Sequence, residues 1–304
     1  MVLIEGTVSA DIMGKIFAFL CALLWALAVI LFKKSGEGLK PIGLNFYKSF
    51  ISMLLLIPVL LIVGTELIPS NVTIEDLLVL VLSGILGVAI SDTLFFKSLN
   101  MLGAGLTAIV DCLYSPIIIF LSYIFLVNEI TFKEFSGGIL VISAILVATF
   151  RLKEKERSRK DIFFGFLYGT GAMIAMGISV VVMKPVIDKA PILWVTEVRL
   201  ISGTIALSIL LYLNKDKKEI LASLIKKANY KYALPATILG SFIAMIMWIS
   251  AFKLTDMNSA AILNQTNTIF IIVFATIFLK EKFTLRKAVA TTLGIIGSVI
   301  VLLG

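Results

Sequence analysis

Long apolar runs separated by short polar segments dominate the chain. Eight of these runs carry no charged residue, and they are 16–32, 49–65, 77–91, 135–150, 162–183, 232–252, 257–279 and 288–304. Two more apolar stretches contain charges, with Asp111 inside 104–127 and both Glu197 and Arg199 inside 191–213. Because about 20 apolar residues cross a bilayer as a helix, the pattern predicts an all-α integral membrane protein with about ten transmembrane helices. A membrane β-barrel is disfavoured, since its strands alternate apolar and polar residues.

Composition supports this class and narrows the chemistry. The chain is 60% hydrophobic and 15% charged, with a mean hydropathy of +1.07, whereas soluble proteins are about 45–50% apolar and about 25% charged. It contains no histidine, which excludes His-metal sites, Ser-His-Asp triads and His proton relays. Cys21 and Cys112 lie far apart in apolar runs and are expected to be buried free thiols. The chain has no GxxxxGK[ST] loop, so we expect no ATP-driven step. We also expect no metal, no cofactor and no enzymatic activity.

The two halves of the chain resemble each other on either side of a basic segment, RLKEKERSRKD. Glu129 and Glu281 are 152 residues apart, and Lys48 and Arg199 are 151 residues apart. These offsets divide the chain into a first five-helix repeat at 1–150, a linker at 151–161 and a second five-helix repeat at 162–304. Because a repeat with an odd number of helices enters the membrane from the opposite side in its second copy, we expect two inverted-topology repeats.

Three local patterns leave alternatives open. Gly165 and Gly169 form a GxxxG motif, which predicts close packing between helices, with a homodimer contact as the alternative. The basic stretch 214–231 spaces its apolar residues as a helix on the membrane surface does, although an ordinary charged loop fits equally well. Pro116 frees the carbonyl of Cys112, which predicts a kink, and a gating hinge is the weaker alternative.

Two stretches carry a resemblance to a known family. LYSPIIIFLSYIFLVNEIT at 113–131 and AAILNQTNTIFIIVFATIFLKEKFT at 260–284 are similar to the EamA-type family of the drug/metabolite transporter superfamily. The resemblance extends over nearly the whole chain, but Thr268 stands where members usually have proline, and Lys48 where many have arginine. It implies efflux or exchange of a small metabolite, often an amino acid or a related compound, across the inner (plasma) membrane.

Lysine and arginine gather on one side of the predicted topology. The loops after the first, third, fifth, seventh and ninth spans contain 20 of them, and the opposite side contains 5. The positive-inside rule then places both termini outside the cytoplasm, whereas members of the resembled family are commonly described with both termini inside. The net charge of +8 indicates basic cytoplasmic loops rather than a nucleic-acid partner.

Asp111 is the strongest candidate for a functional side chain. A charge near the bilayer centre costs at least about 2.5 kcal/mol on insertion scales, so it requires a partner, a wet cavity or a function. Thr107, Asp111, Tyr114 and Ser115 share the spacing of one helix face. We expect Asp111 and Tyr114 to bind substrate, with Asp111 holding a substrate amine or a coupling proton. The alternative is a carboxyl group fixed by structural hydrogen bonds.

Asn264, Gln265 and Asn267 form a second polar stripe, at the place in the ninth span that mirrors Asp111. Two stripes that face one axis would build a midplane site from a duplicated fold. We therefore expect the third, fourth, sixth, eighth and ninth spans to surround a substrate cavity, with Trp25 as one wall. Hydrogen bonding between helices is the alternative explanation.

Four further charged residues lie in predicted spans and are candidates for proton coupling or gating: Lys48, Asp92, Glu197 and Arg199. Asp92 is expected near the end of its helix, at the membrane edge. Lys48 and Arg199 take equivalent helix positions, where snorkelling or an ion pair between helices is the alternative. Glu197 and Arg199 occupy different faces of one helix, so each needs its own partner.

Together these features predict a secondary transporter that moves a small metabolite by alternating access. The bilayer surrounds the protein, and a monomer is sufficient. A lipid or lipid-precursor flippase is the alternative, followed by an integral-membrane enzyme of lipid metabolism or a scaffold. The lack of histidine and of catalytic motifs argues against the enzyme, and the two polar stripes argue against the scaffold.

Overall fold

The computed structural model describes residues 2–126, 131–149, 158–255 and 257–302, and every regular element in these ranges is a helix. The first half contains α1 (Val2–Ser35), α2 (Pro41–Val63), α3 (Ile74–Gly84), the π-helix η1 (Ile85–Ser91), α4 (Asp92–Leu102), α5 (Ala104–Asp111), α6 (Tyr114–Leu126) and α7 (Phe132–Thr149). The second half contains α8 (Arg159–Lys189), α9 (Ile192–Leu213), α10 (Lys217–Ile225), α11 (Lys227–Ala236), the π-helix η2 (Thr237–Ile243), α12 (Ala244–Leu254), α13 (Met257–Gln265), α14 (Asn267–Phe278) and α15 (Leu285–Leu302). The prediction of an all-α protein is confirmed.

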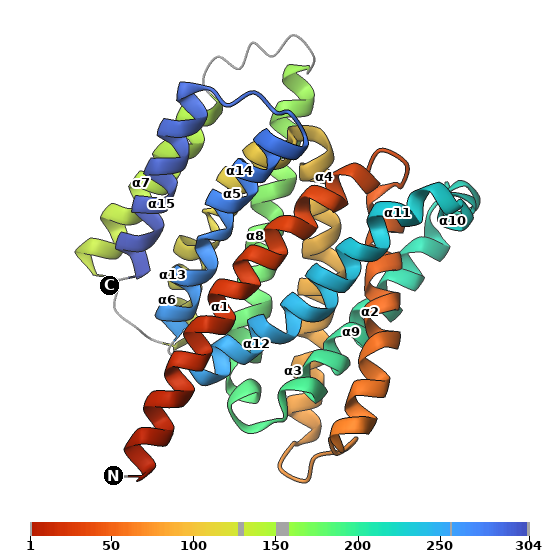
Figure 1. The fold of residues 1–304 in the computed structure, drawn as a ribbon, viewed down its shortest axis with the longest axis vertical. Coiled ribbons are helices and arrows are strands. Elements are labelled where there is room, and N and C mark those ends of the chain that lie inside the picture. The colour runs from red at the N-terminus through yellow and green to blue at the C-terminus, as the bar shows by residue number, and fades with distance from the viewer. Residues whose placement is uncertain (1, 127–130, 150–157, 256, 303–304) are drawn as a thin grey trace.

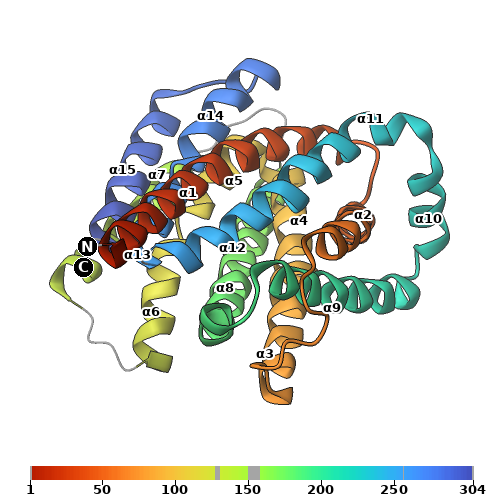
Figure 2. The same ribbon diagram turned by 60° about the horizontal axis from the view of Figure 1, so that its bottom comes forward.

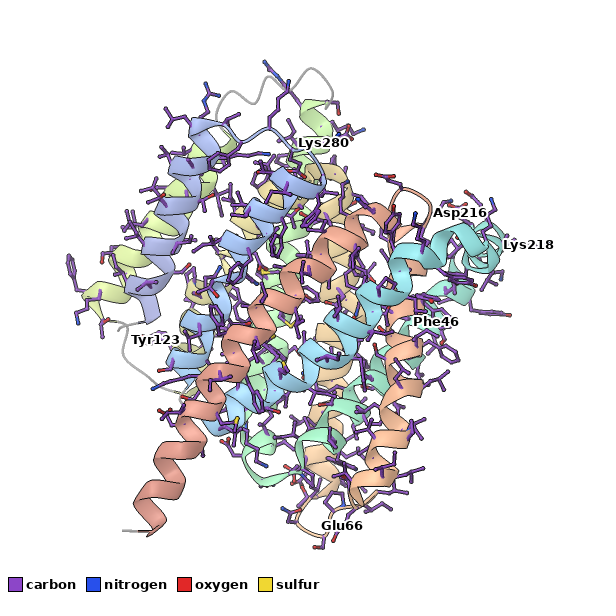
Figure 3. All side chains as sticks on the ribbon, in the orientation of Figure 1. Phe46, Glu66, Tyr123, Asp216, Lys218 and Lys280 are labelled. Carbon is purple, nitrogen blue, oxygen red and sulfur yellow. The ribbon has the colours of Figure 1, made fainter. Side chains whose placement is uncertain are left out.

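Several segments of the described chain, some of them built from consecutive helices, are long and apolar enough to cross a membrane. Among the described residues, seven segments meet this condition: Ala10–Ser35, Pro41–Val63, Ile74–Leu102, Ala104–Phe125, Arg159–Lys189, Ile192–Leu213 and Tyr230–Leu254. Phe135–Ala148 and Leu263–Phe278 are shorter apolar helices. In Figure 3, charged Lys218, Lys280 and Glu66 project from the ends of the bundle, whereas Phe46 and Tyr123 lie on its flanks. The chain is therefore a multi-pass membrane protein.

The order of elements in the first half recurs in the second. The π-helices η1 and η2 each interrupt a membrane-length helix, and they begin 152 residues apart. The α5–α6 pair is one interrupted span and the α13–α14 pair is another, with the interruptions directly after Asp111 and Gln265. The duplication indicated by Lys48 and Arg199 thus extends to the irregularities of the backbone.

The first helix of each half packs against helices of the other half. Helix α1 packs against α12 and α14, and α8 packs against α4 and α6, which are the corresponding elements of the other half. Helix α2 packs against α9, and α7 against α15, so each of these helices contacts its own counterpart. In Figure 1, α1 runs upward from the N-terminus and α8 runs downward. Figures 1 and 2 both place α7 and α15 together at one edge of the bundle.

The GxxxG motif brings α8 directly against α4. A Cβ atom at Gly165 would lie 2.6 Å from a carbon of Leu102, and one at Gly169 would lie 2.8 Å from Ser98 Oγ. Contacts this short leave no room for a side chain at either position. The motif therefore serves helix packing inside one chain, and it does not present a homodimer face.

The second basic stretch contains a helix, α10, at one end of the bundle (Figure 1). Ile220 is buried, and a Cβ atom at Gly43 of α2 would lie 2.7 Å from its side chain. Lys40, directly before α2, forms ion pairs with Asp216 at 3.0 Å and Glu219 at 2.7 Å. Hydrogen bonds to the two carboxylates raise the pKa of Lys40. The stretch is therefore helical, and its Ile220 side chain packs against α2.

Candidate substrate cavity

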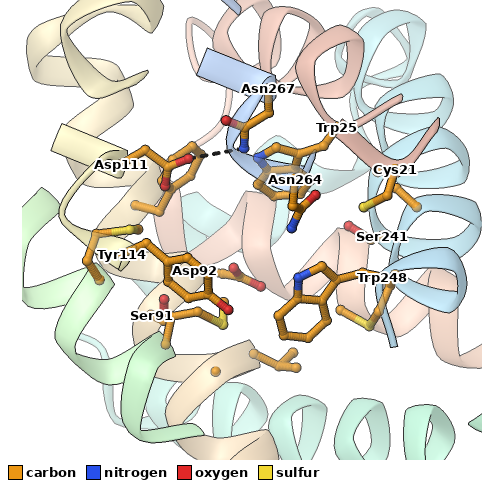
Figure 4. Close-up of a pocket in the computed structure, with 18 of the residues that line it drawn as sticks. Cys21, Trp25, Ser91, Asp92, Asp111, Tyr114, Ser241, Trp248, Asn264 and Asn267 are labelled. Atoms are coloured by element: carbon orange, nitrogen blue, oxygen red, sulfur yellow. Dashed lines mark hydrogen bonds between the residues drawn. The ribbon is translucent and has the colours of Figure 1, made fainter. Parts of the chain in front are cut away.

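A cavity of about 120 Å³ lies between the two halves (Figure 4). The first half lines it with Cys21, Trp25, Lys48, Gly87, Val88, Ser91, Asp92, Phe95, Asp111 and Tyr114. The second half lines it with Met173, Met176, Arg199, Gly240, Ser241, Ala244, Met245, Trp248, Asn264, Gln265 and Asn267. An engineered protein cavity of about 150 Å³ holds benzene, so this one has the size for a small molecule.

Nine of the sequence-predicted residues line this cavity: Trp25, Lys48, Asp92, Asp111, Tyr114, Arg199, Asn264, Gln265 and Asn267. The five spans expected to surround it all contribute. The first, second and seventh spans contribute as well, through α1, α2 and α9. These three spans face the cavity through Cys21 and Trp25 of α1, Lys48 of α2 and Arg199 of α9.

Lys48 and Asp92 form a buried ion pair across α2 and α4. Lys48 Nζ lies 2.7 Å from Asp92 Oδ2, and the two side chains are 1% and 8% exposed. Asp92 is the first residue after the π-helix η1, well inside the span Ile74–Leu102. The expected position of Asp92 at the membrane edge is therefore wrong. The charge-free run ends at Ser91, but the helix continues through α4 to Leu102, and this places Asp92 inside the span.

Arg199 faces the cavity from α9 and has different surroundings. Its guanidinium donates from Nη2 to Ser179 Oγ at 3.1 Å, and its central carbon lies 5.5 Å from the centroid of the Trp248 ring. Nε and Nη1 have no hydrogen-bond partner among the described residues. Its charge is thus held against an aromatic face, and most of its donors remain unused.

Glu197 is the one charged candidate that does not line the cavity. It is 5% exposed, and neither of its carboxylate oxygens has a hydrogen-bond partner within the described part of the chain. Since residues two apart on a helix point to different faces, Arg199 reaches the cavity from α9 and Glu197 does not. Glu197 therefore stays a candidate for proton coupling only outside the cavity.

Asp111 and Asn267 meet where two interrupted spans face each other. Asp111 ends α5, Asn267 begins α14, and Asn267 Nδ2 donates to Asp111 Oδ2 at 3.2 Å (Figure 4). Tyr114, the first residue of α6, also faces the cavity, and its hydroxyl has no partner among the described residues. Polar side chains at helix interruptions are a recurring way to build a transporter site.

The rest of the second stripe connects the halves by hydrogen bonds. Gln265 Nε2 donates to Thr268 Oγ1 at 3.1 Å, and Ser115 Oγ donates to Gln265 Oε1 at 3.3 Å. The Thr268 hydroxyl lies 3.2 Å from Asn267 Oδ1. Of the first stripe, Thr107 turns away and donates to the Gly103 carbonyl. Asp111, Tyr114, Asn264, Gln265 and Asn267 thus line the cavity, while Gln265 and Ser115 also hydrogen-bond between helices.

Pro116 lies in the first turn of α6, where proline is tolerated. The helix is interrupted at residues 112–113, so the expected kink takes the form of a break. The hydroxyl of Ser298 on α15 donates to the freed carbonyl of Cys112 at 3.3 Å. The break is therefore stabilised from the other half, and Pro116 itself does not line the cavity.

Glu281, whose offset from Glu129 indicates the repeat, caps helix α5 of the other half, in keeping with the helix capping or loop ion pairs that its place after a span predicts. Its carboxylate accepts hydrogen bonds from the backbone N–H groups of Ala104 at 2.7 Å and Gly105 at 3.1 Å, and Lys287 Nζ lies 3.2 Å away. A carboxylate at a helix N-terminus accepts hydrogen bonds from the free backbone N–H groups and interacts favourably with the positive end of the helix dipole. Glu281 thereby positions α5, which carries Asp111. Its repeat counterpart, Glu129, lies outside the described residues.

Most of the cavity-lining positions of the second half follow from those of the first half by a constant offset. The five lining positions of η1 and α4 are 87, 88, 91, 92 and 95, and adding 153 gives the five lining positions of η2 and α12. The same offset takes Asp111 to Asn264 and Tyr114 to Asn267. Phe95 and Trp248 correspond in this way, and neither was singled out. No group of three His, Cys, Asp or Glu side chains in the described ranges could hold a metal ion.

Comparisons with known proteins agree with this arrangement. The family model described as "EamA-like transporter family" matches residues 12–150 and 163–303. An uncharacterized transporter of Archaeoglobus fulgidus is 23% identical over 295 residues, which cover 96% of this chain and 98% of the relative. A solved structure described as "Crystal structure of protein" superposes with a TM-score of 0.69 at 14% identity, over 95% of this chain and 96% of that one. At this identity the solved structure supports the fold alone.

Proposed function

Because the chain belongs to the EamA-like transporter family, we propose that it is a secondary transporter that carries a small metabolite across the inner membrane through the cavity. The observation that carries the proposal is a cavity lined by both halves that holds two charges without an ion-pair partner. Arg199 and Asp111 both line it, and within the described residues neither forms an ion pair. A charge inside a membrane domain is energetically costly, so an intramembrane charge without an ion-pair partner indicates a functional site.

The proposed architecture is ten membrane helices in two inverted five-helix repeats. The supporting observations are the recurring π-helices, the two interrupted spans and the exchange of packing partners between the halves. Helices α1 and α8 run in opposite directions in Figure 1, as inverted repeats require. Alternating access follows from rocking of the two halves around a fixed site.

The proposed substrate is an amino acid or a related compound, moved by efflux or exchange. Asp111 would hold a substrate ammonium, with Asn264 and Asn267 as neutral hydrogen-bonding partners. A buried carboxylate loses hydration when ionised, so it also binds protons readily. Competition between substrate and proton for one carboxylate is the simplest route to antiport.

The test of function measures metabolites inside and outside cells that overexpress or lack the protein. A small metabolite that accumulates in the medium on overexpression and inside on deletion is the expected result. The same compound should then exchange across proteoliposomes that contain the purified protein. A lipid that changes leaflet instead, or a new lipid product, would replace the proposal with a flippase or an enzyme.

Water access to the cavity can be tested by cysteine labelling. In a background without Cys21 and Cys112, cysteines at 264 and 267 should react with a water-soluble maleimide, and substrate should slow both reactions. Cysteines at 271 and 274 in the same span are the matched controls. Equal reactivity at all four positions would mean that the stripe is packing rather than a pathway.

We also propose that the basic end of the bundle faces the cytoplasm, which follows the positive-inside rule. Lys218 and Glu66 lie at opposite ends in Figure 3. In intact cells an impermeant maleimide should label a cysteine at 66 and not one at 218. The reverse result would establish the orientation that is commonly described for the family.

A further inference from the structure

Arg199 is a buried cation whose hydrogen-bonding capacity is largely unused. Its side chain is 1% exposed and faces the cavity, and of its three nitrogens only Nη2 has a partner within the described residues, Ser179 Oγ. Nε carries one N–H group and Nη1 carries two, so most of the five donors point at no acceptor. Burying charged donors without acceptors is unfavourable. The arrangement points to an acceptor that comes from outside the chain.

Lys48, the equivalent cation of the first half, has a carboxylate partner. Lys48 binds Asp92 at 2.7 Å, so the chain itself supplies its anion. The offset of 153 that relates the lining positions places Met245 where the second half would need that aspartate. Among the described carboxylates, none forms an ion pair with Arg199. The fold thus provides two cations at related places and an anion for only one of them.

We propose that Arg199 is the anion-binding residue of the cavity and that it selects substrates that carry a carboxylate. This inference rests on the proposed function, since it takes the cavity as the substrate site. The planar guanidinium matches the two oxygens of a carboxylate with parallel N–H donors. Trp248 lies against the same guanidinium, with its ring centroid 5.5 Å from the central carbon.

The charge of the cavity favours a carboxylate over a phosphate. Lys48 and Asp92 neutralise each other, which leaves one cation, Arg199, and one carboxylate, Asp111. A carboxylate brings a single negative charge to the single free cation. A dianionic phosphate would bring an excess negative charge into a cavity that already contains Asp111, where repulsion is poorly screened.

Tyr114 provides a second donor for the same group. Its hydroxyl is buried without a partner among the described residues, and in Figure 4 it points across the cavity toward Trp248. Tyr114 is contributed by α6 and Arg199 by α9, so one carboxylate would contact both halves.

The first experiment needs no variant. Isothermal titration calorimetry on the purified wild type measures Kd for each of the twenty L-amino acids, for lactate and pyruvate, for the amide of each acid, and for inorganic phosphate. We expect at least one carboxylate to bind, and its amide, which keeps the size but loses the charge, to bind at least tenfold more weakly. If no carboxylate binds, if acid and amide bind equally, or if phosphate alone binds, the proposal is overturned.

The second experiment assigns the discrimination to Arg199. In Arg199→Gln the preference for the acid over its amide should fall to less than threefold, and Arg199→Lys, which keeps the charge but lacks the planar fork, should keep an intermediate preference. The control removes a cation of α8 that does not line the cavity, Lys184→Gln, and should keep the tenfold preference. An Arg199→Gln protein that loses affinity for acid and amide equally would show a structural role and overturn the assignment.

The two proposals fail in different ways. If the preferred carboxylate binds with Arg199-dependent discrimination but does not exchange across proteoliposomes, the transport function is wrong and the binding site stands. If the metabolite comparison finds a transported compound without a carboxylate, transport stands and the selectivity of Arg199 is wrong. If Arg199→Gln does not fold, the acid and amide titrations on wild type together with Arg199→Lys still decide the matter.

Discussion

Each half of the cavity contributes one cation, and the two cations lie at related positions but have different partners. In the first half, Lys48 is neutralised by Asp92 of the same half at 2.7 Å. In the second half, Arg199 lies over Trp248 and has no carboxylate partner among the described residues. The two halves therefore share the position of the cation but differ in whether a carboxylate neutralises it. As a result, the two unneutralised charges, Asp111 and Arg199, come from opposite halves.

This difference has a consequence for transport. A substrate that contacts both Asp111 and Arg199 connects the two halves, and the halves are the parts that must move in alternating access. If Arg199 were neutralised within its own half, as Lys48 is, the cavity would offer no free cation to a substrate carboxylate. Four changes make one half more like the other, or loosen their junction, and they are given from the largest expected effect to the smallest.

The first change converts Asp111 into asparagine, the residue that its counterpart Asn264 already is. Asp111→Asn keeps size and hydrogen bonding to Asn267 but cannot bind or release a proton. We expect pH-gradient-driven transport in proteoliposomes to be abolished, while the protein remains folded and monodisperse in detergent. Full gradient-driven transport by this variant would show that Asp111 is structural, with Asp92 or Glu197 as the next candidates for coupling.

The second change converts Asp92 into methionine, the residue at the related position 245. Asp92→Met leaves Lys48 buried without an anion, and breaking a buried ion pair in this way costs about 3–5 kcal/mol. Replacing both partners, Lys48→Met with Asp92→Met, should recover most of that loss, because no charge is left behind. Chemical unfolding in detergent micelles gives both values. Equal losses in the single and double variants would mean that the pair contributes shape rather than charge.

The third change converts Trp248 into phenylalanine, which is what Phe95 is in the first half. The indole face attracts a cation more strongly than a phenyl ring does, and a whole cation–π contact contributes about 0.5–1 kcal/mol at exposed sites. Trp248→Phe loses only part of such a contact, so it should weaken binding of a carboxylate probe by no more than about fivefold, with little change for the corresponding amide. Calorimetric Kd values measure both. Equal weakening for acid and amide would assign Trp248 to packing alone.

The fourth change weakens the contact between α5 and the segment after α14. Glu281→Gln removes the negative charge at the N-terminus of α5 and leaves Lys287 without its ion pair. A charge at a helix N-terminus contributes about 0.3–1 kcal/mol, and more when it is partly buried, so unfolding should require about 1 kcal/mol less free energy. Lys282→Gln, at an exposed position in the same segment, is the control. An unchanged stability of Glu281→Gln would mean that water satisfies these donors as well as the carboxylate does.

Particular residues show how far the sequence allows the site to be predicted. Asp111 and Asn267 were correctly placed on facing stripes, because a polar residue in an apolar run must face the protein interior. The expected stripe from Thr107 to Ser115 assumes one continuous helix. In the structure Thr107 and Asp111 lie in α5, whereas Tyr114 and Ser115 lie in α6, beyond the break at residues 112–113. A helical wheel holds only while the backbone keeps its period.

The sequence by itself determined that this is a membrane protein of apolar helices, that its halves are related, and which charges lie within the spans. These properties follow from local composition and spacing, which need no knowledge of neighbours. Only the tertiary structure decided that Asp92 reaches Lys48 across α2 and α4, and that Arg199 meets Trp248 instead of a carboxylate. Ion pairing depends on which helices are adjacent and how each is rotated. In this chain the π-helix η1 shifts that rotation directly before Asp92, and η2 does so two residues before Met245.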